Sequence, residues 1–442
     1  MRIAALVKQV PDLEAFELDA AGTPDPAQSR FVMSAYCRRA VAQAVELAAA
    51  VGDGHCTAIT LGAPSGEDVL REAIAWANER NVVMDGILVH DPAFDGSDTL
   101  ATAGALTAII EREGPFDLVL VGRQSTDIGT GQVGPMVAEL LDLPFATGAR
   151  YLSMQSNRLH VRCKHEDAWV QMTMQLPAVV STASGLIDPC TMPAKALAAV
   201  PAEWIRTLTA SDLGAGPWGL DASAIVVDPH RAEPRNATHA APTMVPAARG
   251  AIGPPIGVVL PDGDPDAMRV LLGCASLLAA GIDGHVVAFV TEMPVDAAQL
   301  GSWGADEVLS LVGTLVEEDV ADEVSAWAAE ATPWAILTAS TATGREIAAR
   351  AAAALGAGLA SDAARLVIDD GRLVVWRTAY DGRAVAAVTA TTELQMATVL
   401  TGSLTTLTPR DSIAAHTHAM TVEPRGRVRV VSRAPTAAPA RS

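Results

Sequence analysis

The sequence has few aromatic residues and almost no lysine. Aromatic residues make up 4% of the 442 residues, and the lysines are Lys8, Lys164 and Lys195. Because 50% of the residues are hydrophobic, we expect cores built from small aliphatic side chains and closely packed helices. Acidic residues outnumber basic ones, and the net charge of −20 produces a field that repels nucleic acid and anionic membranes. Nucleic acid is therefore excluded as a partner.

Cysteine pairs and long apolar runs are also lacking. The five cysteines include no C-x-x-C pair, which argues against a disulfide framework and against iron–sulfur ligation. The longest uncharged run, residues 168–187, contains Gln, Thr, Ser and Pro, so it predicts strands rather than a membrane span. The first residues predict a strand that is too short for a secretory signal. We therefore expect a soluble, cytoplasmic protein that is not an integral membrane protein.

Strand and helix patterns alternate along most of the chain, which predicts an α/β fold with parallel strands and crossover helices. The order of strand, loop and helix in residues 119–152 recurs in residues 335–366, and such self-similarity indicates two copies of one fold. We predict two homologous doubly wound parallel-sheet domains. The predicted parts are a first domain at 1–216, a Pro-rich linker at 217–255, a second domain at 256–412 and a flexible tail at 413–442.

The stretch from Asp117 to Ala146 is the most informative part of the sequence. An apolar run, Leu118 to Val121, predicts a buried strand that ends at Gly122, and a polar loop rich in hydroxyl groups and glycine follows. Apolar residues then recur at helical spacing from Val133 onward. A strand, a small-residue loop and a helix N-terminus together form a common phosphate-binding arrangement, because free backbone N–H groups and the helix dipole favour an anion.

Gly129, Gly131 and Gly134 form a G-x-G-x-x-G pattern within this stretch. In a dinucleotide fingerprint the glycines follow the strand directly, and an acidic residue stands about 20 positions later. Here six residues separate Gly122 from the first glycine, and residues 152–159 contain no Asp or Glu. A nucleotide loop of another kind is the preferred interpretation, with an NAD site and a ligand-free loop as alternatives. The corresponding second loop, residues 340–345, has fewer glycines and is predicted to be structural.

Residues for acid–base catalysis or metal binding are not visible in the sequence. His160 and His165 would point to opposite faces of one strand, so they cannot share a metal ion. His416 and His418 lie in the predicted tail. Asp369-Asp370-Gly371 predicts a hairpin turn rather than a catalytic pair. These features favour a binding or carrier protein whose chemistry comes from a cofactor.

Several ordered motifs identify a resemblance. In the first half they are Val7-Lys8-Gln9-Val10-Pro11-Asp12, the Ala-Val-x-x-Ala-Val-Glu-Leu helix from Ala40, Leu120-Val121-Gly122-Arg123-Gln124, Thr130-Gly131-Gln132-Val133-Gly134-Pro135, and Leu176-Pro177-Ala178-Val179-Val180. In the second half they are Thr343-Gly344-Arg345-Glu346, residues 355–362, residues 377–383, and Ala397-Thr398-Val399-Leu400-Thr401. Residues 1–200 resemble the β subunit of electron transfer flavoproteins, and residues 256–408 resemble the N-terminal domain of the α subunit.

The resemblance implies that the first domain binds an adenine nucleotide, either AMP or FAD. The residues implied to contact it are Leu6, Ser34, Ala35, Tyr36, Cys37, Leu61, Gly122, Arg123, Gln124, Ser125, Thr126, Asp127, Ile128, Gly129, Thr130, Gly131, Gln132 and Val133. Met192, after Asp188-Pro189, is implied to be an apolar anchor for a partner dehydrogenase.

The resemblance also implies a function and partners. Only a Pro/Arg/Ala-rich segment follows Pro409, so the redox-active FAD is expected to come with a separate subunit of the α C-terminal type. The chain would be a fused β/α-type scaffold that relays electrons from a flavin dehydrogenase toward a quinone-linked acceptor. It would be an electron-carrier subunit more than a catalyst. The alternative is a non-redox scaffold or sensor that binds only an adenine nucleotide, and a nicotinamide-dependent enzyme is a more distant third.

Overall fold

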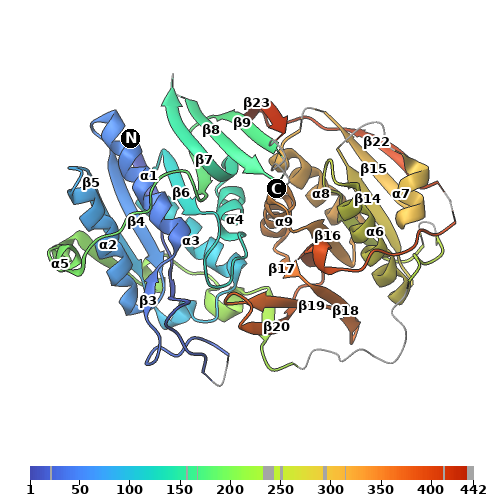
Figure 1. Ribbon diagram of the computed structural model, residues 1–442, viewed down its shortest axis with the longest axis horizontal. Helices are drawn as coiled ribbons and strands as arrows, with labels where there is room; N and C mark the ends of the chain where they lie inside the picture. The colour runs from blue at the N-terminus through green and yellow to red at the C-terminus, as the bar shows by residue number, and fades with distance from the viewer. Residues whose placement is uncertain are drawn as a thin grey trace, which may run out of the picture. The chain divides into compact units, whose positions relative to one another are not determined.

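The computed structural model describes residues 1–19, 22–155, 158–166, 168–231, 243–248, 252–291, 296–313, 315–411 and 414–435. The chain divides into two compact units. Unit 1 consists of Met1–Ser223 with Gly426–Ser442, and unit 2 consists of Ala224–Arg425. Each unit is described by itself, and Figure 1 labels their helices and strands.

Unit 1 is built on a ten-stranded sheet flanked by helices. Its strands are β1 (Arg2–Leu6), β4 (His55–Leu61), β5 (Val83–Val89), β6 (Leu118–Gly122), β7 (Phe145–Gln155), β8 (Arg158–His165), β9 (Ala168–Met174), β10 (Ala178–Thr182), β11 (Ile205–Leu208) and β23 (Val428–Pro435), with a small separate hairpin of β2 (Gln9–Pro11) and β3 (Phe31–Met33). Its helices are α1 (Ala35–Val51), α2 (Glu67–Asn78), α3 (Thr99–Glu113), α4 (Val133–Leu140) and α5 (Ala194–Ala198). The strand order is β11-β5-β4-β1-β6-β10-β7-β8-β9-β23.

The first seven strands in this order are parallel and covered on both faces. Alternate residues of β1 face opposite ways, yet all four from Ile3 to Leu6 are buried. Burial on both faces is typical of a parallel sheet between two helix layers. Helix α1 packs beside α2, and α3 packs beside α4. Strands β8, β9 and β23 extend the sheet in antiparallel fashion.

Unit 2 contains a seven-stranded parallel sheet and a separate four-stranded antiparallel sheet. The parallel strands are β13 (Pro255–Val259), β14 (His285–Val290), β15 (Glu307–Val312), β16 (Ala335–Ala339), β17 (Gly358–Ala363), β21 (Gln395–Val399) and β22 (His416–Thr421), and the antiparallel ones are β12 (Ile225–Asp228), β18 (Arg365–Asp369), β19 (Arg372–Ala379) and β20 (Ala384–Ala390). The helices are α6 (Pro265–Gly281), α7 (Ala297–Trp303), α8 (Glu317–Ala331) and α9 (Ala342–Leu355).

The two parallel sheets have the same topology. The order in unit 2 is β22-β15-β14-β13-β16-β21-β17, which matches β11-β5-β4-β1-β6-β10-β7 strand for strand. In each unit the first strand along the parallel core lies at the centre, and the strand–loop–helix repeat falls on β6–α4 and β16–α9. The predicted fold class, two homologous doubly wound α/β domains, is therefore confirmed.

Helices α8 and α9 of unit 2 enclose a buried charged cluster. Arg350 is fully buried, with its Nε 3.5 Å from Glu346 Oε1 and its Nη2 3.8 Å from Glu318 Oε2. Burial, followed by the negative charge of Glu317, raises the pKa of Glu346 well above its usual value, against the opposing effect of Arg350. The guanidinium of Arg350 thus lies close to the carboxyl groups of both Glu346 and Glu318, and all three side chains are buried.

The structure differs from the predicted linker and tail. Within 217–255, Ile225–Asp228 forms β12 and pairs with β20, whereas residues 232–242 and 249–251 lie outside the described residues. Within the predicted flexible tail 413–442, His416–Thr421 forms β22 and Val428–Pro435 forms β23. All three are short edge strands with mostly exposed side chains, so their sequences carry little hydrophobic periodicity.

Candidate functional site

The focal loop, residues 123–132, joins β6 to α4 at the carboxyl edge of the unit 1 sheet. β6 pairs with β1 in parallel, with Leu6 opposite Val121. β1 pairs with β4 in the same direction, with Leu6 opposite Ile59. The predicted contact residues Leu6, Leu61 and Gly122 therefore end three parallel strands at one edge, which is where ligands bind in open α/β sheets.

The start of α1 comes to the same place because Gly122 has no side chain. A Cβ atom at Gly122 would lie 2.9 Å from the Cβ of Tyr36 and 3.0 Å from the backbone nitrogen of Cys37. The Thr182 hydroxyl donates to the Tyr36 carbonyl at 3.0 Å, which ties β10 to the same turn. The structure thus brings the predicted residues Ser34 to Cys37 against the focal loop.

The loop presents open backbone donors. Gly129 and Gly131 have φ angles of 71° and 68°, a left-handed conformation that glycine adopts without strain. Among the described residues, no acceptor is found for the backbone N–H groups of Gly129, Thr130 and Gly131. Unpaired N–H groups on a left-handed glycine loop form a concave site that suits an anion such as phosphate.

Both helix N-termini at this edge also lack a side-chain cap. Ser34 precedes α1 and Gln132 precedes α4, and neither side chain caps its helix. Gln132 instead accepts a hydrogen bond from the Thr99 hydroxyl at 2.6 Å, which fixes the end of the loop to α3. Uncapped N–H groups and two helix dipoles add to the preference for negative charge.

In the equivalent loop of unit 2, residues 340–345, a side chain of the loop caps the N-terminus of the following helix. Thr341 caps α9 by accepting from the backbone N–H of Gly344 at 3.0 Å. A Cβ atom at Gly344 would lie 2.2 Å from the Ala339 carbonyl oxygen, so the backbone is already packed there. This arrangement favours a structural role for residues 340–345.

A partly buried ion pair shapes the focal loop. Lys8 Nζ lies 2.7 Å from Asp127 Oδ2, and Asp127 has only 8% of its side chain exposed. Burial alone would raise the pKa of Asp127, but the charge and hydrogen bond of Lys8, with smaller effects from Ser125 and the Ile128 backbone, lower the pKa below its usual value. Asp127 is therefore ionised at neutral pH and neutralised by Lys8.

Tyr36 and Cys37, at the start of α1, lie next to the end of β6 and the first residue of the loop. The guanidinium carbon of Arg123 is 5.8 Å from the centre of the Tyr36 ring, within range of a cation–π interaction. Burial raises the pKa of the Cys37 thiol, against smaller opposing effects from Lys8 and Gly122. A buried, protonated thiol is a poor nucleophile, so Cys37 contributes packing rather than chemistry.

The predicted contact residues gather in four segments at this edge. Within the loop, Gln124, Ser125 and Thr126 are half-buried and Ile128 is exposed, while Ala35 is exposed at the start of α1. Two participants, Lys8 and Thr99, were not predicted as contacts. The sequence drew attention to Lys8 only through the Val7–Asp12 motif, of which it is part. Nothing in the sequence indicated that Thr99 pairs with Gln132.

Met192 lies in the hydrophobic core of unit 1 with 9% of its surface exposed. Arg38 holds this segment by donating to the Cys190 carbonyl at 2.9 Å and by pairing with Glu72 of α2. Burial raises the pKa of Glu72, against the opposing charge and hydrogen bond of Arg38. Met192 is therefore packed as a core residue of this unit, and its implied role as an apolar anchor for a partner dehydrogenase stays a prediction.

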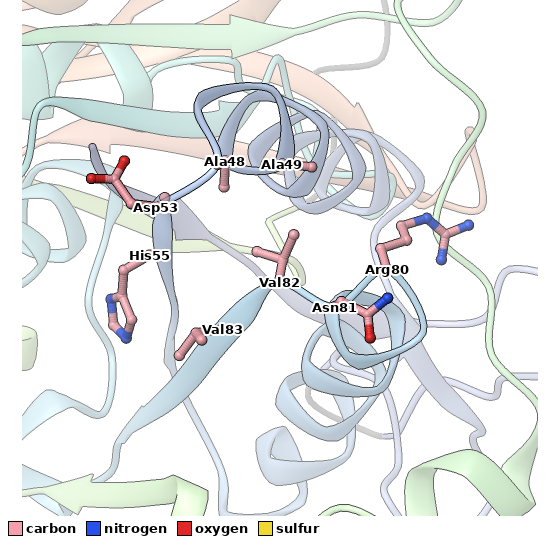
Figure 2. A pocket seen from close by; sticks show the side chains of 10 residues that line it. Ala48, Ala49, Asp53, His55, Arg80, Asn81, Val82 and Val83 are labelled. Atoms are coloured by element: carbon pink, nitrogen blue, oxygen red, sulfur yellow. The ribbon is translucent and has the colours of Figure 1, made fainter.

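A separate pocket of about 420 Å³ lies at the opposite edge of the sheet (Figure 2). It is lined by the end of α1, the start of β4 and the turn before β5, including Asp53, His55, Arg80 and Asn81. Because it sits at the amino ends of β4 and β5, it is not continuous with the focal loop. Its shape alone does not make it the functional site.

Metal-binding clusters and membrane-spanning helices are both absent from the described residues. No group of three or more His, Cys, Asp or Glu side chains is arranged to hold a metal ion in that part of the chain. Among the helices so described, none combines the length and apolar character needed to cross a membrane.

Comparison with known proteins gives a consistent result. The family model described as electron transfer flavoprotein domain matches residues 27–212 and 266–425. An electron transfer flavoprotein subunit beta of Thermoanaerobacterium thermosaccharolyticum is 32% identical over 221 residues, which are 48% of this chain and 80% of the relative. The caffeyl-CoA reductase-Etf complex subunit CarD of Acetobacterium woodii is 30% identical over 230 residues, 50% of this chain and 84% of the relative. The acryloyl-CoA reductase electron transfer subunit gamma of Anaerotignum propionicum is 33% identical over 186 residues, 41% and 67% respectively.

Proposed function

The chain belongs to the electron transfer flavoprotein family, and from this premise we propose that it is a fused β/α-type scaffold of an electron carrier. Unit 1 corresponds to the β-type domain and binds an adenine nucleotide at the focal loop. Unit 2 repeats the same fold and has no matching ligand loop, because Thr341 closes the start of α9.

The open loop between β6 and α4 carries the nucleotide-binding part of this proposal. The backbone N–H groups of Gly129 to Gly131 have no acceptor among the described residues, and α1 and α4 begin without side-chain caps nearby. These donors suit the phosphate of AMP or of FAD. Leu61, which is half-buried at the end of β4, provides apolar surface that suits an adenine ring, while Leu6 is buried at the end of β1.

The redox part of the proposal concerns partners. Two relatives are named as an electron transfer subunit of acryloyl-CoA reductase and as a subunit of a caffeyl-CoA reductase-Etf complex, which supports electron transfer with an enzyme partner. As the electron donor we propose a flavin dehydrogenase. We place the electron-carrying FAD on a separate subunit of the α C-terminal type, and the acceptor is quinone-linked. FAD supplies the electron chemistry when bound, and this chain would bind and orient the flavin. The five cysteines, all within the described residues, form no disulfide, which supports action in the reducing cytoplasm.

The direct test is to identify what the purified protein holds. The protein is denatured and the released nucleotides are separated by chromatography, and the same is done after co-expression with a candidate FAD-domain subunit. AMP or FAD from the chain alone, and visible flavin absorbance in the co-expressed complex, are the expected results. A colourless complex that releases AMP would refute the redox role and leave the alternative, a non-redox adenine-nucleotide scaffold or sensor.

A loop variant tests where the nucleotide binds. Gly131→Val places a branched side chain at a left-handed position that faces the proposed phosphate site, so nucleotide retention should be lost. Gly371→Val is the matched control, because Gly371 has a similar φ of 73° in a hairpin of unit 2 with open space around it. Unchanged retention in Gly131→Val would show that the focal loop is not the site.

A further inference from the structure

Lys8 and Asp127 form an ion pair whose two side chains differ in their exposure to solvent. Lys8 lies two residues after the end of β1, and Asp127 lies inside the focal loop, 119 residues away. The Lys8 side chain is 47% exposed, whereas the Asp127 side chain is 8% exposed. The carboxylate is thus enclosed by the loop, and the ammonium group stands on the solvent side of it.

A carboxylate in an anion-binding loop repels phosphate unless its charge is cancelled. Lys8 cancels it at 2.7 Å, in surroundings where burial strengthens the attraction between the two groups. The loop can therefore keep Asp127 as a rigid internal anchor without presenting negative charge to a ligand.

The Lys8 ammonium group has hydrogen-bond donors that Asp127 does not use. An ammonium carries three N–H donors, and within the described residues the Lys8 ammonium meets one acceptor, Asp127 Oδ2. Other cations at this edge are held elsewhere: Arg123 lies against the Tyr36 ring, Arg39 donates to the Ala35 carbonyl and Arg38 donates to the Met33 carbonyl. Lys8 is half exposed and is tied through Asp127 to the loop that carries the open N–H groups of Gly129 to Gly131.

We propose that Lys8 is a phosphate-binding residue of this site, held at the mouth of the loop by Asp127. Its ammonium donates to the phosphate of the adenine nucleotide, while the loop N–H groups and the two helix N-termini contact the same group from the other side. The assignment rests on the proposed nucleotide site and adds to it the charged side chain that recognises phosphate rather than the adenosine part.

The test compares AMP with adenosine, which lacks the phosphate. Lys8→Met alone would leave Asp127 buried and unpaired, which destabilises the loop. The double variant Lys8→Met with Asp127→Asn removes the donor, leaves no unpaired charge and keeps the net charge at −20. Calorimetric titration of nucleotide-stripped protein should show AMP affinity lower by about 10- to 100-fold, as expected for a hydrogen bond to a charged group. Adenosine affinity should change by less than about 3-fold.

A second ion pair of unit 1 supplies the matched control. Arg206 Nη2 and Glu113 Oε2 are 2.8 Å apart, and Arg206 lies near the start of β11, at the amino edge of the sheet. Arg206→Met with Glu113→Gln makes the same kind of charge-neutral change and should leave the ratio of AMP to adenosine affinity unaltered. Lys8→Arg, which keeps a cation next to Asp127, should retain most of the preference for AMP.

Each result decides between distinct possibilities. Equal losses of AMP and adenosine affinity in the double variant would show that the pair only shapes the loop, and would overturn the role of Lys8. Unchanged affinities for both would overturn it as well. Wild-type protein that binds neither compound, or a Gly131→Val variant that binds both normally, would overturn the nucleotide site itself.

Discussion

Replacing Gly122 by alanine tests the close approach of β6 to the start of α1. The added Cβ would lie 2.9 Å from the Cβ of Tyr36, 3.0 Å from the nitrogen of Cys37 and 3.1 Å from the carbonyl carbon of Tyr36. Two of these atoms are backbone, so no side-chain rotation relieves the overlap. Gly122 is not among the residues with positive φ, so the backbone itself accepts alanine and the whole effect comes from lack of space.

The expected cost follows from this geometry. The turn at Tyr36 must retreat until the nearest contact reaches the ordinary range, which begins at 3.4 Å, and overpacking of this kind destabilises by about 1–3 kcal/mol. Because the shift moves the start of α1 away from the focal loop, AMP affinity should fall as well. Hydrogen exchange followed peptide by peptide measures the stability of β6 and α1 separately from unit 2.

Gly62 provides the comparison for this variant. It follows β4, the second neighbour of β6 in the sheet, and a Cβ atom there would meet nothing within 4 Å. Gly62→Ala should be neutral or stabilise by up to about 1 kcal/mol through the unfolded state. If Gly122→Ala and Gly62→Ala had equal stability, the inferred contact between β6 and α1 would be refuted.

Four further predictions concern charge and the sheet edge. Asp127 has a lowered pKa, so its stabilisation is present above an unfolded pKa of about 3.9 and is lost as pH falls; Asp127→Asn should flatten this acid dependence in thermal melts. Glu346 has a raised pKa, so its stabilisation is lost as pH rises; Glu346→Gln should gain stability over wild type between pH 5 and 8. Arg350→Met, in contrast, should cost about 3–5 kcal/mol in denaturant unfolding. Truncation after Arg425 removes β23 and exposes β9, so larger species should appear in size-exclusion chromatography; an elution profile the same as that of the full chain would contradict this.

The parallel core of the fold was predictable because its signal is local. Strands such as β1, β4 and β6 are short apolar runs between helical patterns, and the repeat in the sequence falls on equivalent strands of the two sheets. The turn at Asp370-Gly371 was also predictable, since two residues with φ of 50° and 73° join β18 to β19. Asp and Gly tolerate this left-handed conformation.

The edge strands were not predictable because their strand conformation depends on pairing with strands that are distant in the sequence. β23 pairs with β9, which lies more than 250 residues earlier, and most of its side chains are exposed. A sequence of Arg, Ser and Pro with a few valines carries no strong pattern of its own. Its strand conformation comes from the ladder of hydrogen bonds that β9 offers.

The position of the focal loop was predictable, and the ion pair that holds it was not. The loop from Gly122 to Val133 could be located from its glycines and from the strand before it. The pairing of Asp127 with Lys8 depends on two segments 119 residues apart, and no spacing in the sequence reveals it. The burial of Met192 likewise depends on Arg38 and Glu72, which come from α1 and α2.

The return of the chain to unit 1 in β23 affects the order in which the protein can fold during synthesis. Residues 224–425 are made before β23, and at about 5–20 residues per second this takes on the order of 10–40 s. Throughout that time β9 has an unpaired edge, which is the kind of surface that other chains can pair with. Domains usually fold in succession from the N-terminus, but here the first sheet is completed only after the whole second unit has left the ribosome.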